Sequence, residues 1–341
     1  MINENFGRLP DGRQTHLYTI SCGQLTAKVS DYGAHLVSVL VPDKDGALSD
    51  VVLGYDDANG YRTSNGAFLG AVVGRNANRV KGAAFCLNGR AVRLAPNEGV
   101  NNLHSGPDCF HLRLWETVFH TENAVRFRLC SPSGDQGFPG NAVIEVTYAL
   151  DSLGGLHIVY DADADRDTVF NLTNHSYFNL DGHGDVQKQT LMIQADSFTI
   201  NDEGCLPTGE IVSVEGTAMD FRTPKAIGRD ADADELCVKY SKGYDANFIL
   251  NGASPAAVAH SDESGITMTM TTDQPGVQLY TANGMAPRIG KAGQEYGHRA
   301  AFCLETQHYP DCVHHPDWPS CVLRSGERFE SVTTYGFSIG D

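Results

Sequence analysis

Four short segments hold many polar side chains within otherwise apolar surroundings. They cover residues 74–80, 97–106, 170–180 and 302–310, and they contain amides, histidines, arginine and a carboxylate. These groups hydrogen-bond sugar hydroxyls, and aromatic residues among them can pack on the apolar face of a sugar ring. Because amides carry no net charge, this composition favours a neutral carbohydrate over a phosphorylated or carboxylated ligand.

The fourth segment has the alternation of a β-strand. Phe302 and Leu304 would point to one face of a sheet, and Glu305 to the other. The stretch 277–280 alternates in the same way and places Gln278 on its more polar face. An acid on the second face of a central strand lies in solvent or in a cleft. The pattern predicts that a twisted sheet presents Glu305 and Gln278 on one concave surface, although an ordinary solvated face would give the same alternation.

His104 and His175 each lie inside an amide-rich run. A lone histidine hydrogen-bonded to backbone is a common structural feature, and this interpretation stays open for each residue. Two such histidines in two polar runs weaken the structural interpretation, but they do not remove it.

Several motifs of other chemistries are absent from the sequence. There is no GxxxxGK[ST] phosphate loop, no HExxH metal motif and no GxSxG nucleophile elbow. A Cys/His-rich stretch over 303–321 fits no standard zinc spacing, and surface histidines with buried thiols are the favoured interpretation; its members include Cys303, His308, Cys312, His314 and His315. We therefore expect no metal and no nucleotide or redox cofactor.

The elements that must position these residues are predicted to be strands. Apolar and polar residues alternate with a period of two over 125–129, 144–148, 156–160 and 266–270. Asn88-Gly89 separates two short apolar runs and predicts a two-residue hairpin turn. The 36 glycines and 14 prolines exclude long uninterrupted helices, and a short helix is expected only over 231–240. No linker or repeat is evident, so residues 1–341 are predicted to form one large antiparallel β domain.

Charge and cysteine content limit the partners. The 25 basic and 42 acidic residues give a net charge of −17, which opposes binding to nucleic acid or to anionic membrane surfaces. The nine cysteines are scattered along the chain, and we interpret them as reduced thiols that serve mostly as small buried hydrophobic residues. With no basic and apolar leader and no apolar run of about 18 residues, we expect a cytoplasmic protein.

Seven motifs in order resemble the galactose mutarotase (aldose 1-epimerase) family over nearly the whole chain. They lie at 74–79, 103–106, 174–180, 206–209, 243–248, 278–281 and 305–307. The resemblance implies an all-β fold, a single large antiparallel β-sandwich of the galactose mutarotase-like supersandwich type with few short helices. It also implies an isomerase of hexose and galactose metabolism that interconverts the anomers of free aldohexoses such as D-galactose and D-glucose.

The resemblance also implies roles for individual residues. Glu305 matches the general base at the C1 hydroxyl, His175 the general acid at ring O5, and His104 a second active-site histidine. The sugar-binding positions it implies are Asn78, Arg79, Asp245 and Gln278. Because a free histidine is only partly protonated at pH 7, we hypothesise that a nearby carboxylate such as Glu305 or Asp245 raises the pKa of His175.

Alternatives remain at this point. A glycosidase would use two carboxylates, and Asp245 with Glu305 could supply them. A non-catalytic sugar-binding module would bind the sugar without changing it. A hexose-phosphate epimerase would need additional Lys or Arg in the cleft. The expected partner is a small monosaccharide, with the protein a monomer or homodimer, while the preferred aldose is left open.

Overall fold

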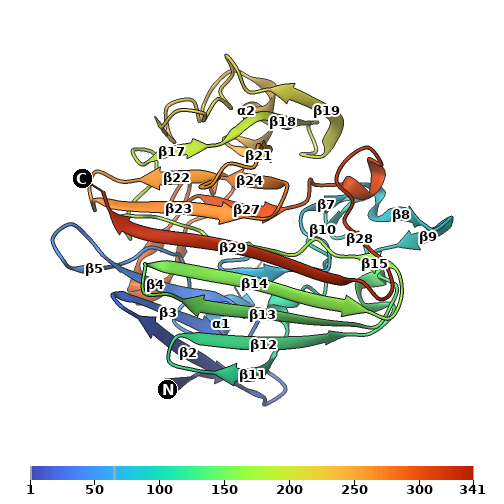
Figure 1. The fold of residues 1–341 in the computed structure, drawn as a ribbon, viewed down its shortest axis with the longest axis horizontal. Coiled ribbons are helices and arrows are strands. Elements are labelled where there is room, and N and C mark those ends of the chain that lie inside the picture. The colour runs from blue at the N-terminus through green and yellow to red at the C-terminus, as the bar shows by residue number, and fades with distance from the viewer. Residues whose placement is uncertain (1, 64–66, 341) are drawn as a thin grey trace.

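The computed structural model describes residues 2–63 and 67–340. Its largest element is a nine-stranded antiparallel sheet, which spans the molecule in Figure 1. The strands lie in the order β11 (Glu116–His120), β12 (Ala124–Ser131), β13 (Ala142–Leu150), β14 (Gly155–Ala164), β29 (Arg328–Ile339), β23 (Ile266–Thr272), β22 (Ala257–His260), β17 (Thr190–Ile193) and β20 (Lys225–Ala226).

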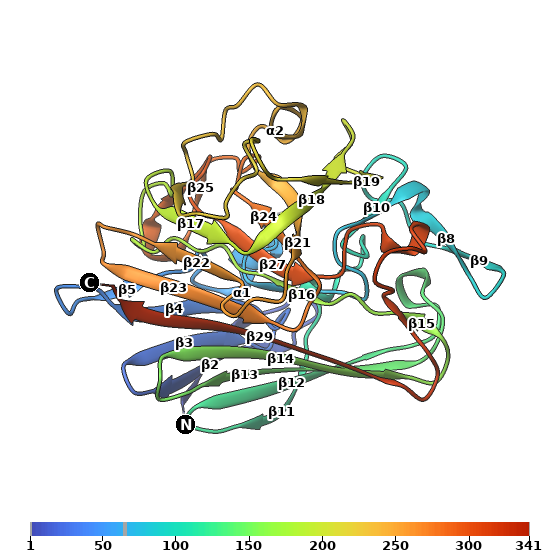
Figure 2. The ribbon, with the colours of Figure 1, turned by 45° about the horizontal axis from the view of Figure 1, so that its top comes forward.

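Two five-stranded antiparallel sheets accompany the large sheet. The N-terminal one contacts β12 and β13 through its strands β2 and β3 (Figure 2). It consists of β1 (Ile2–Arg8), β2 (Gln14–Cys22), β3 (Leu25–Ser30), β4 (Leu36–Pro42) and β5 (Leu48–Asp50). The other, called here the site sheet, has the order β19 (Pro207–Ser213), β18 (Ala195–Asn201), β21 (Asp245–Leu250), β24 (Gly276–Tyr280) and β27 (Cys303–Gln307).

Short elements complete the described chain. Two-stranded pairs are β6 (Ala71–Val73) with β16 (Thr173–His175), β7 (Arg79–Val80) with β10 (Asn102–Leu103), β8 (Ala84–Leu87) with β9 (Arg90–Arg93), β15 (Thr168–Val169) with β28 (Val322–Leu323), and β25 (Arg288–Ile289) with β26 (Glu295–Tyr296). The α-helices are α1 (Ala58–Thr63) and α2 (Leu236–Ser241), and 3-10 turns cover Lys81–Ala83, Phe110–Leu112, Asp135–Gly137, Lys291–Gly293 and Cys312–His314.

The sequence alternation sets the packing of the sheets. On β13, Ile144, Val146 and Tyr148 are buried, and on β14 Ile158 and Tyr160 are buried with them. They belong to one apolar core that also takes side chains from β2–β4 and from the inner face of the site sheet. Burial of one strand face therefore holds the layers together, and the predicted all-β sandwich is confirmed.

Local predictions met mixed outcomes. The Asn88-Gly89 hairpin is confirmed, and both residues have positive φ, as the tight turn requires. The helix expected over 231–240 is observed only over Leu236–Ser241, because Glu235 is still extended and acts as the N-terminal boundary. All nine cysteines are free thiols, but only four are buried, so the expectation of mostly buried thiols is wrong for the exposed Cys86 and Cys130.

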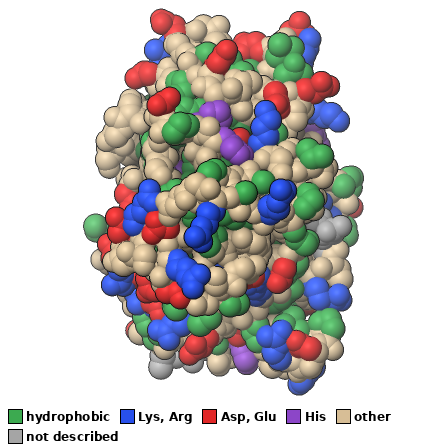
Figure 3. All heavy atoms as spheres, turned by 90° about the vertical axis from the view of Figure 1, so that its right-hand side faces the viewer, with side chains coloured by type: hydrophobic (Ala, Val, Ile, Leu, Met, Phe, Trp, Pro, Cys, Tyr) green, Lys and Arg blue, Asp and Glu red, His purple; other side chains and the backbone are tan. Residues whose placement is uncertain are grey.

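Charged side chains of both signs cover the face shown in Figure 3. Figure 3 shows lysine and arginine side chains near the middle of the face that carries β8, β9 and β28. Arg90, Arg93 and Arg166 line a groove there beside the hairpin. Acidic side chains are interspersed with them on this face, and Asp165 and Asp167 line the same groove. Within the described residues, no helix combines the length and apolar character needed to cross a bilayer.

Candidate active site

The site begins on one face of the site sheet. Gln278 on β24 pairs directly with Glu305 on β27, and Asn247 on β21 pairs with Gln278, so the three side chains lie on the same face. The opposite face, with Leu279 and Leu304, enters the apolar core. Glu305 and Gln278 are each only 2% exposed. The shared face is confirmed, and it is a covered one, not an ordinary solvated surface.

Strand β16 crosses this face and brings His175 to Glu305. His175 Nε2 lies 3.6 Å from Glu305 Oε1. The imidazole ring is stacked between two aromatic rings, with Tyr177 at 4.9 Å and Phe68 at 6.0 Å between centroids. This stacking fixes the ring plane, and it leaves the ring edge directed at the carboxylate.

A second wall comes from two irregular segments that hold each other. The Asn78 backbone N–H donates to His104 Nδ1 at 3.1 Å, and the His104 N–H donates to the Asn78 carbonyl at 3.0 Å. Both residues have positive φ, at 60° and 52°. Because Nδ1 accepts a hydrogen bond, neutral His104 carries its hydrogen on Nε2. His104 is thereby prepared to donate a hydrogen bond.

Two charged residues are each held by a partner. Arg79 donates from Nε and Nη2 to the two carboxylate oxygens of Glu98, at 2.7 and 2.8 Å. Asp245 Oδ1 accepts from Gln278 Nε2 at 2.6 Å. Such bidentate and charge-assisted bonds fix the direction of a side chain as well as its position.

These walls enclose a cleft of about 160 Å³. Six of the seven predicted site residues line it: Asn78, Arg79, His104, His175, Asp245 and Glu305. Gln278 does not line the cleft; it lies beneath it and holds Asp245. The structure thus brings the predicted residues together from six separate parts of the chain.

Burial controls the protonation of the cleft. It lowers the pKa of His175 to about 4 and lowers that of His104 well below its usual value, where His175, Arg79 and His111 add repulsion. Burial, reinforced by the charge of Asp245, raises the pKa of Glu305 well above its usual value. The hypothesis that a neighbouring carboxylate raises the pKa of His175 is therefore wrong, because burial dominates this pKa and the contribution that opposes it is a backbone hydrogen bond.

Some buried atoms of the cleft have no hydrogen-bond partner among the described residues. They include Glu305 Oε2 and His175 Nδ1. An unpaired buried polar atom is costly, and most folded proteins pair such atoms. The atoms at the centre of this cleft are thus ready to receive hydrogen bonds from a ligand.

His104, His175 and Glu305 also place potential ligand atoms within 4.8 Å of one another. The hydrogen bond from Asn78 to His104 Nδ1 puts the imidazole hydrogen on Nε2, where it would oppose a metal ion. Along the Cys/His-rich stretch no comparable cluster forms among the described residues; instead His314 bonds Asp311, and His315 stacks on Trp318 at 4.1 Å.

Sequence reasoning assigned no role to several residues of the site. Glu98 holds Arg79, and Phe68, Leu103, Tyr177 and Tyr280 line the cleft. Glu98 and Tyr177 lie inside the polar segments, which was a usable signal. Phe68 lies outside all four segments, and its contact with His175 depends on the fold.

A carboxylate and an imidazole that face each other in a small polar cleft are groups that can move protons on a neutral substrate. The aldose 1-epimerase family model matches residues 16–336. Galactose mutarotase of Bos taurus is 40% identical, over 98% of this chain and 97% of the relative. Aldose 1-epimerase of Escherichia coli (strain K12) is 37% identical, over 99% of each.

Solved structures agree with these relatives. A GalM/aldose epimerase homologue from C. elegans superposes with a TM-score of 0.90 at 33% identity, covering 96% of this chain and 100% of that one. Galactose 1-epimerase from Lactobacillus acidophilus NCFM gives a TM-score of 0.88 at 28% identity, covering 100% and 99%. The chain belongs to the aldose 1-epimerase family, a class of isomerases that exchange the α and β anomers of an aldose.

Proposed function

We propose that this protein interconverts the anomers of free aldohexoses such as D-galactose and D-glucose, with Glu305 as general base and His175 as general acid. The observation that carries the proposal is the 3.6 Å approach of His175 Nε2 to Glu305 Oε1 inside the cleft. Relatives named galactose mutarotase and aldose 1-epimerase support the choice of sugar.

The proposed reaction opens and closes the sugar ring. Glu305 takes the proton of the C1 hydroxyl, His175 gives its proton to ring O5, and the C1–O5 bond breaks to leave an aldehyde. Rotation about C1–C2 exposes the other face of the carbonyl, and closure reverses both proton transfers. No electron is gained or lost, and the two residues return to their starting protonation.

The proposed pair needs one shared proton. The pair can be neutral, with the proton on Glu305, or it can be an ion pair, with the proton on His175. Both forms hold the same number of protons, and only the ion pair can start the reaction. Burial favours the neutral pair. A sugar hydroxyl that donates to the unpaired Glu305 Oε2 stabilises the carboxylate and favours the ion pair. In this proposal the substrate completes the active protonation state.

The other cleft residues bind the sugar in this proposal. His104 donates its Nε2–H to an oxygen near the reacting centre, and Arg79 and Asp245 bind hydroxyls from opposite walls. Asn78 positions His104, and Gln278 positions Asp245. Their fixed directions provide the orientation on which acid–base catalysis depends.

The test is the loss of optical rotation of freshly dissolved α-D-galactose, followed with wild type, Glu305→Gln and His175→Asn. We expect wild type to accelerate the change and each variant to lose about 10²–10⁴-fold in kcat/KM. Glu263→Gln on the surface is the control. Near-wild-type rates in Glu305→Gln would show that Glu305 is not the base.

Two other measurements test the alternative functions. Release of nitrophenol from a nitrophenyl galactoside would favour a glycosidase, and galactose binding without faster anomer exchange would favour a binding module.

We further propose that residues 1–341 act as one domain, in the cytoplasm, as a monomer or homodimer with no nucleic-acid or membrane partner. An apolar core with members from Tyr18 to Phe337 supports one domain, and the net charge of −17 opposes anionic partners. Sedimentation at several concentrations tests the oligomeric state, and a tetramer would contradict the proposal.

A further inference from the structure

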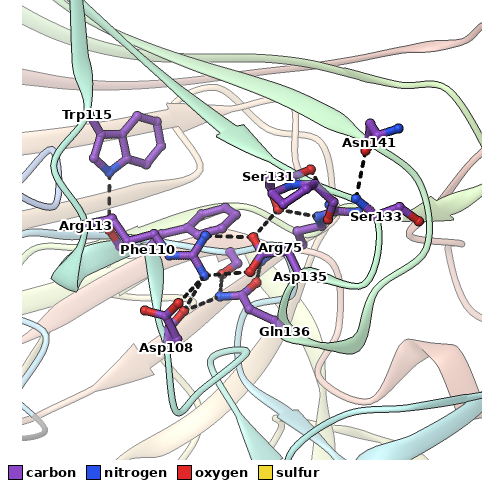
Figure 4. A network of polar contacts seen from close by, with 12 residues as sticks. Arg75, Asp108, Phe110, Arg113, Trp115, Ser131, Ser133, Asp135, Gln136 and Asn141 are labelled. Atoms are coloured by element: carbon purple, nitrogen blue, oxygen red, sulfur yellow. Dashed lines mark hydrogen bonds and ion pairs between the residues drawn. The ribbon is translucent and has the colours of Figure 1, made fainter.

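Arg75 lies at the centre of a buried network on the far side of the loop that carries Asn78 and Arg79. Its exposure is 0%, and no role has been assigned to it so far. Figure 4 shows the network around it, which includes Ser131, Asp135 and Gln136. A charged side chain without exposure to water needs a full set of partners, so its contacts indicate what it does.

All three guanidinium nitrogens donate to neutral acceptors. Nε donates to Ser131 Oγ at 2.9 Å. The two terminal nitrogens donate to four backbone carbonyls and one hydroxyl, namely Pro139 O at 2.8 Å, Ser131 O at 2.7 Å, Gly140 O at 2.9 Å, Pro132 O at 3.2 Å and Thr168 Oγ1 at 3.2 Å. The side chain is thus bound to the 131–140 connection between β12 and β13.

The charge of Arg75 is retained at neutral pH. Burial lowers its pKa to about 10, and the nearby Asp135 opposes that shift. Asp135 is itself bound by Arg113, with 2.7 and 2.8 Å bonds. Six neutral acceptors surround this positive charge, and the planar fork of a guanidinium suits such a set of directions.

The backbone of Arg75 connects this network to both walls of the cleft. Its carbonyl accepts from the Asn171 N–H at 2.8 Å, and the Asn171 carbonyl accepts from the Ala77 N–H at 2.7 Å. Ala77 immediately precedes Asn78, and Asn171 leads into β16, which ends at His175. One residue thus joins the sugar-binding wall to the acid–base wall.

The neighbouring backbone leaves little room for the loop to shift. A Cβ added at Gly74 would lie 2.4 Å from Leu172 Cδ2 and 2.9 Å from the Phe110 ring. Gln136 also holds this point, because its Nε2 donates to the Gly74 carbonyl at 3.2 Å and its Oε1 accepts from the Arg75 N–H at 3.3 Å. The close packing and the hydrogen bonds constrain the loop from two sides.

We infer that Arg75 is a positioning residue that sets the distance between the Asn78–Arg79 wall and His175, and so adjusts both binding and catalysis. This inference rests on the proposed function. Arg75 touches neither the sugar nor the reacting atoms; it acts through the 76–79 loop and through Asn171. A displacement of about 1 Å between catalytic groups and substrate can cost on the order of 10²-fold in rate.

The test is Arg75→Lys, compared with Arg299→Lys. Arg299 is also buried, and its side chain binds Gln187, Ala231 and Asp232, none of which lines the cleft. Lysine keeps the charge of Arg75 and loses its planar fork. We expect Arg75→Lys to lower kcat and raise KM for galactose, with kcat/KM falling about 10- to 10²-fold. Arg299→Lys should have a lower melting temperature than wild type, with kcat and KM unchanged.

Gln136→Ala provides a second variant if Arg75→Lys does not fold. The Gln136 side chain is partly exposed, and its removal breaks the hydrogen bonds to Gly74 and Arg75. We expect the KM for galactose to rise in Gln136→Ala, and we expect its melting temperature to be close to that of Arg299→Lys. Wild-type constants in every folded variant would overturn the inference. If the wild-type protein does not exchange anomers, the proposed function is overturned. If the wild type is active and Arg75→Lys is equally active, only the inference about Arg75 is overturned.

Discussion

Two buried polar regions lie side by side in this molecule and differ in how completely their hydrogen bonds are made. Around Arg75, each guanidinium nitrogen has at least one acceptor. In the cleft, Glu305 Oε2 and His175 Nδ1 have no hydrogen-bond partner of either kind among the described residues. A paired network contributes to stability, whereas unpaired buried atoms cost stability and are free to bind a ligand. Both regions are buried and contain charged side chains, and the Arg75 guanidinium differs from the Glu305–His175 pair in that all its nitrogens are hydrogen-bonded.

The largest expected effect tests the cleft side of this comparison. Glu305→Gln preserves the shape of the side chain and removes the proposed base, so kcat/KM for anomer exchange should fall about 10²–10⁴-fold. The free energy of unfolding should stay equal or rise, because an ionisable group leaves a buried position with an unpaired oxygen. Polarimetry and urea unfolding measure the two quantities. A large loss of stability in Glu305→Gln would show that the cleft residue also supports the fold.

The opposite result is expected in the supporting network. Asp135→Asn weakens the bidentate pair with Arg113 and the bond from Ser131, so the free energy of unfolding should fall by about 2 kcal/mol while kcat/KM falls far less than in Glu305→Gln. Asp108→Asn is the matched control, because Asp108 binds the same Arg113 from an exposed position. Asp108→Asn should lower the free energy of unfolding, measured with urea, by less than about 0.5 kcal/mol. Equal losses in the two variants would contradict the comparison.

A buried histidine outside the cleft gives a pH test. Burial lowers the pKa of His35 from 6.5 to about 4, so between these values the unfolded chain binds a proton that the folded chain does not. The stabilisation is complete above pH 6.5 and is lost as the pH falls toward 4, by up to about 1.4 kcal/mol per pH unit. His35→Gln should flatten the slope of unfolding free energy against pH by about this amount, whereas the exposed His183→Gln should keep the wild-type slope.

The smallest effect concerns the edge of the cleft. Glu98→Gln loosens the bidentate hold on Arg79, so KM for galactose should rise on the order of tenfold with little change in kcat. Glu145→Gln is the control, since Glu145 pairs with Arg126 and Arg128 on the large sheet. Steady-state polarimetry separates the two constants. An unchanged KM would mean that Arg79 does not need Glu98 for its position.

The sequence predicts the parts of this fold that repeat. Alternation over 144–148 and 156–160 predicts strands because one face of each strand is buried, and β13 and β14 confirm it. The same rule places Glu305 and Gln278 on one face. It does not predict that the face is covered, since β16 and the 76–79 loop reach it through long-range contacts.

The irregular part of the site lies beyond such rules. Asn78 and His104 adopt positive φ and hold each other, a geometry that no local pattern indicates. The direction of the pKa shift of His175 depends on burial, so reasoning from a neighbouring carboxylate alone predicts the wrong sign. The roles proposed for Glu305 and His175 come from the family resemblance; the residue pattern alone predicts only a polar, sugar-binding surface.

The last strand of the chain occupies the middle of the largest sheet. In Figure 1, β29 (red) lies between β14 and β23, and it joins the two halves of the nine-stranded sheet. It also supports the strand of Glu305, because Tyr335 Oη donates to the Leu304 carbonyl at 2.8 Å and Thr333 bonds Thr306 at 2.6 Å. Folding of the large sheet and placement of Glu305 are therefore coupled: a change that removes β29 from between β14 and β23 also removes these two bonds to the strand that carries Glu305.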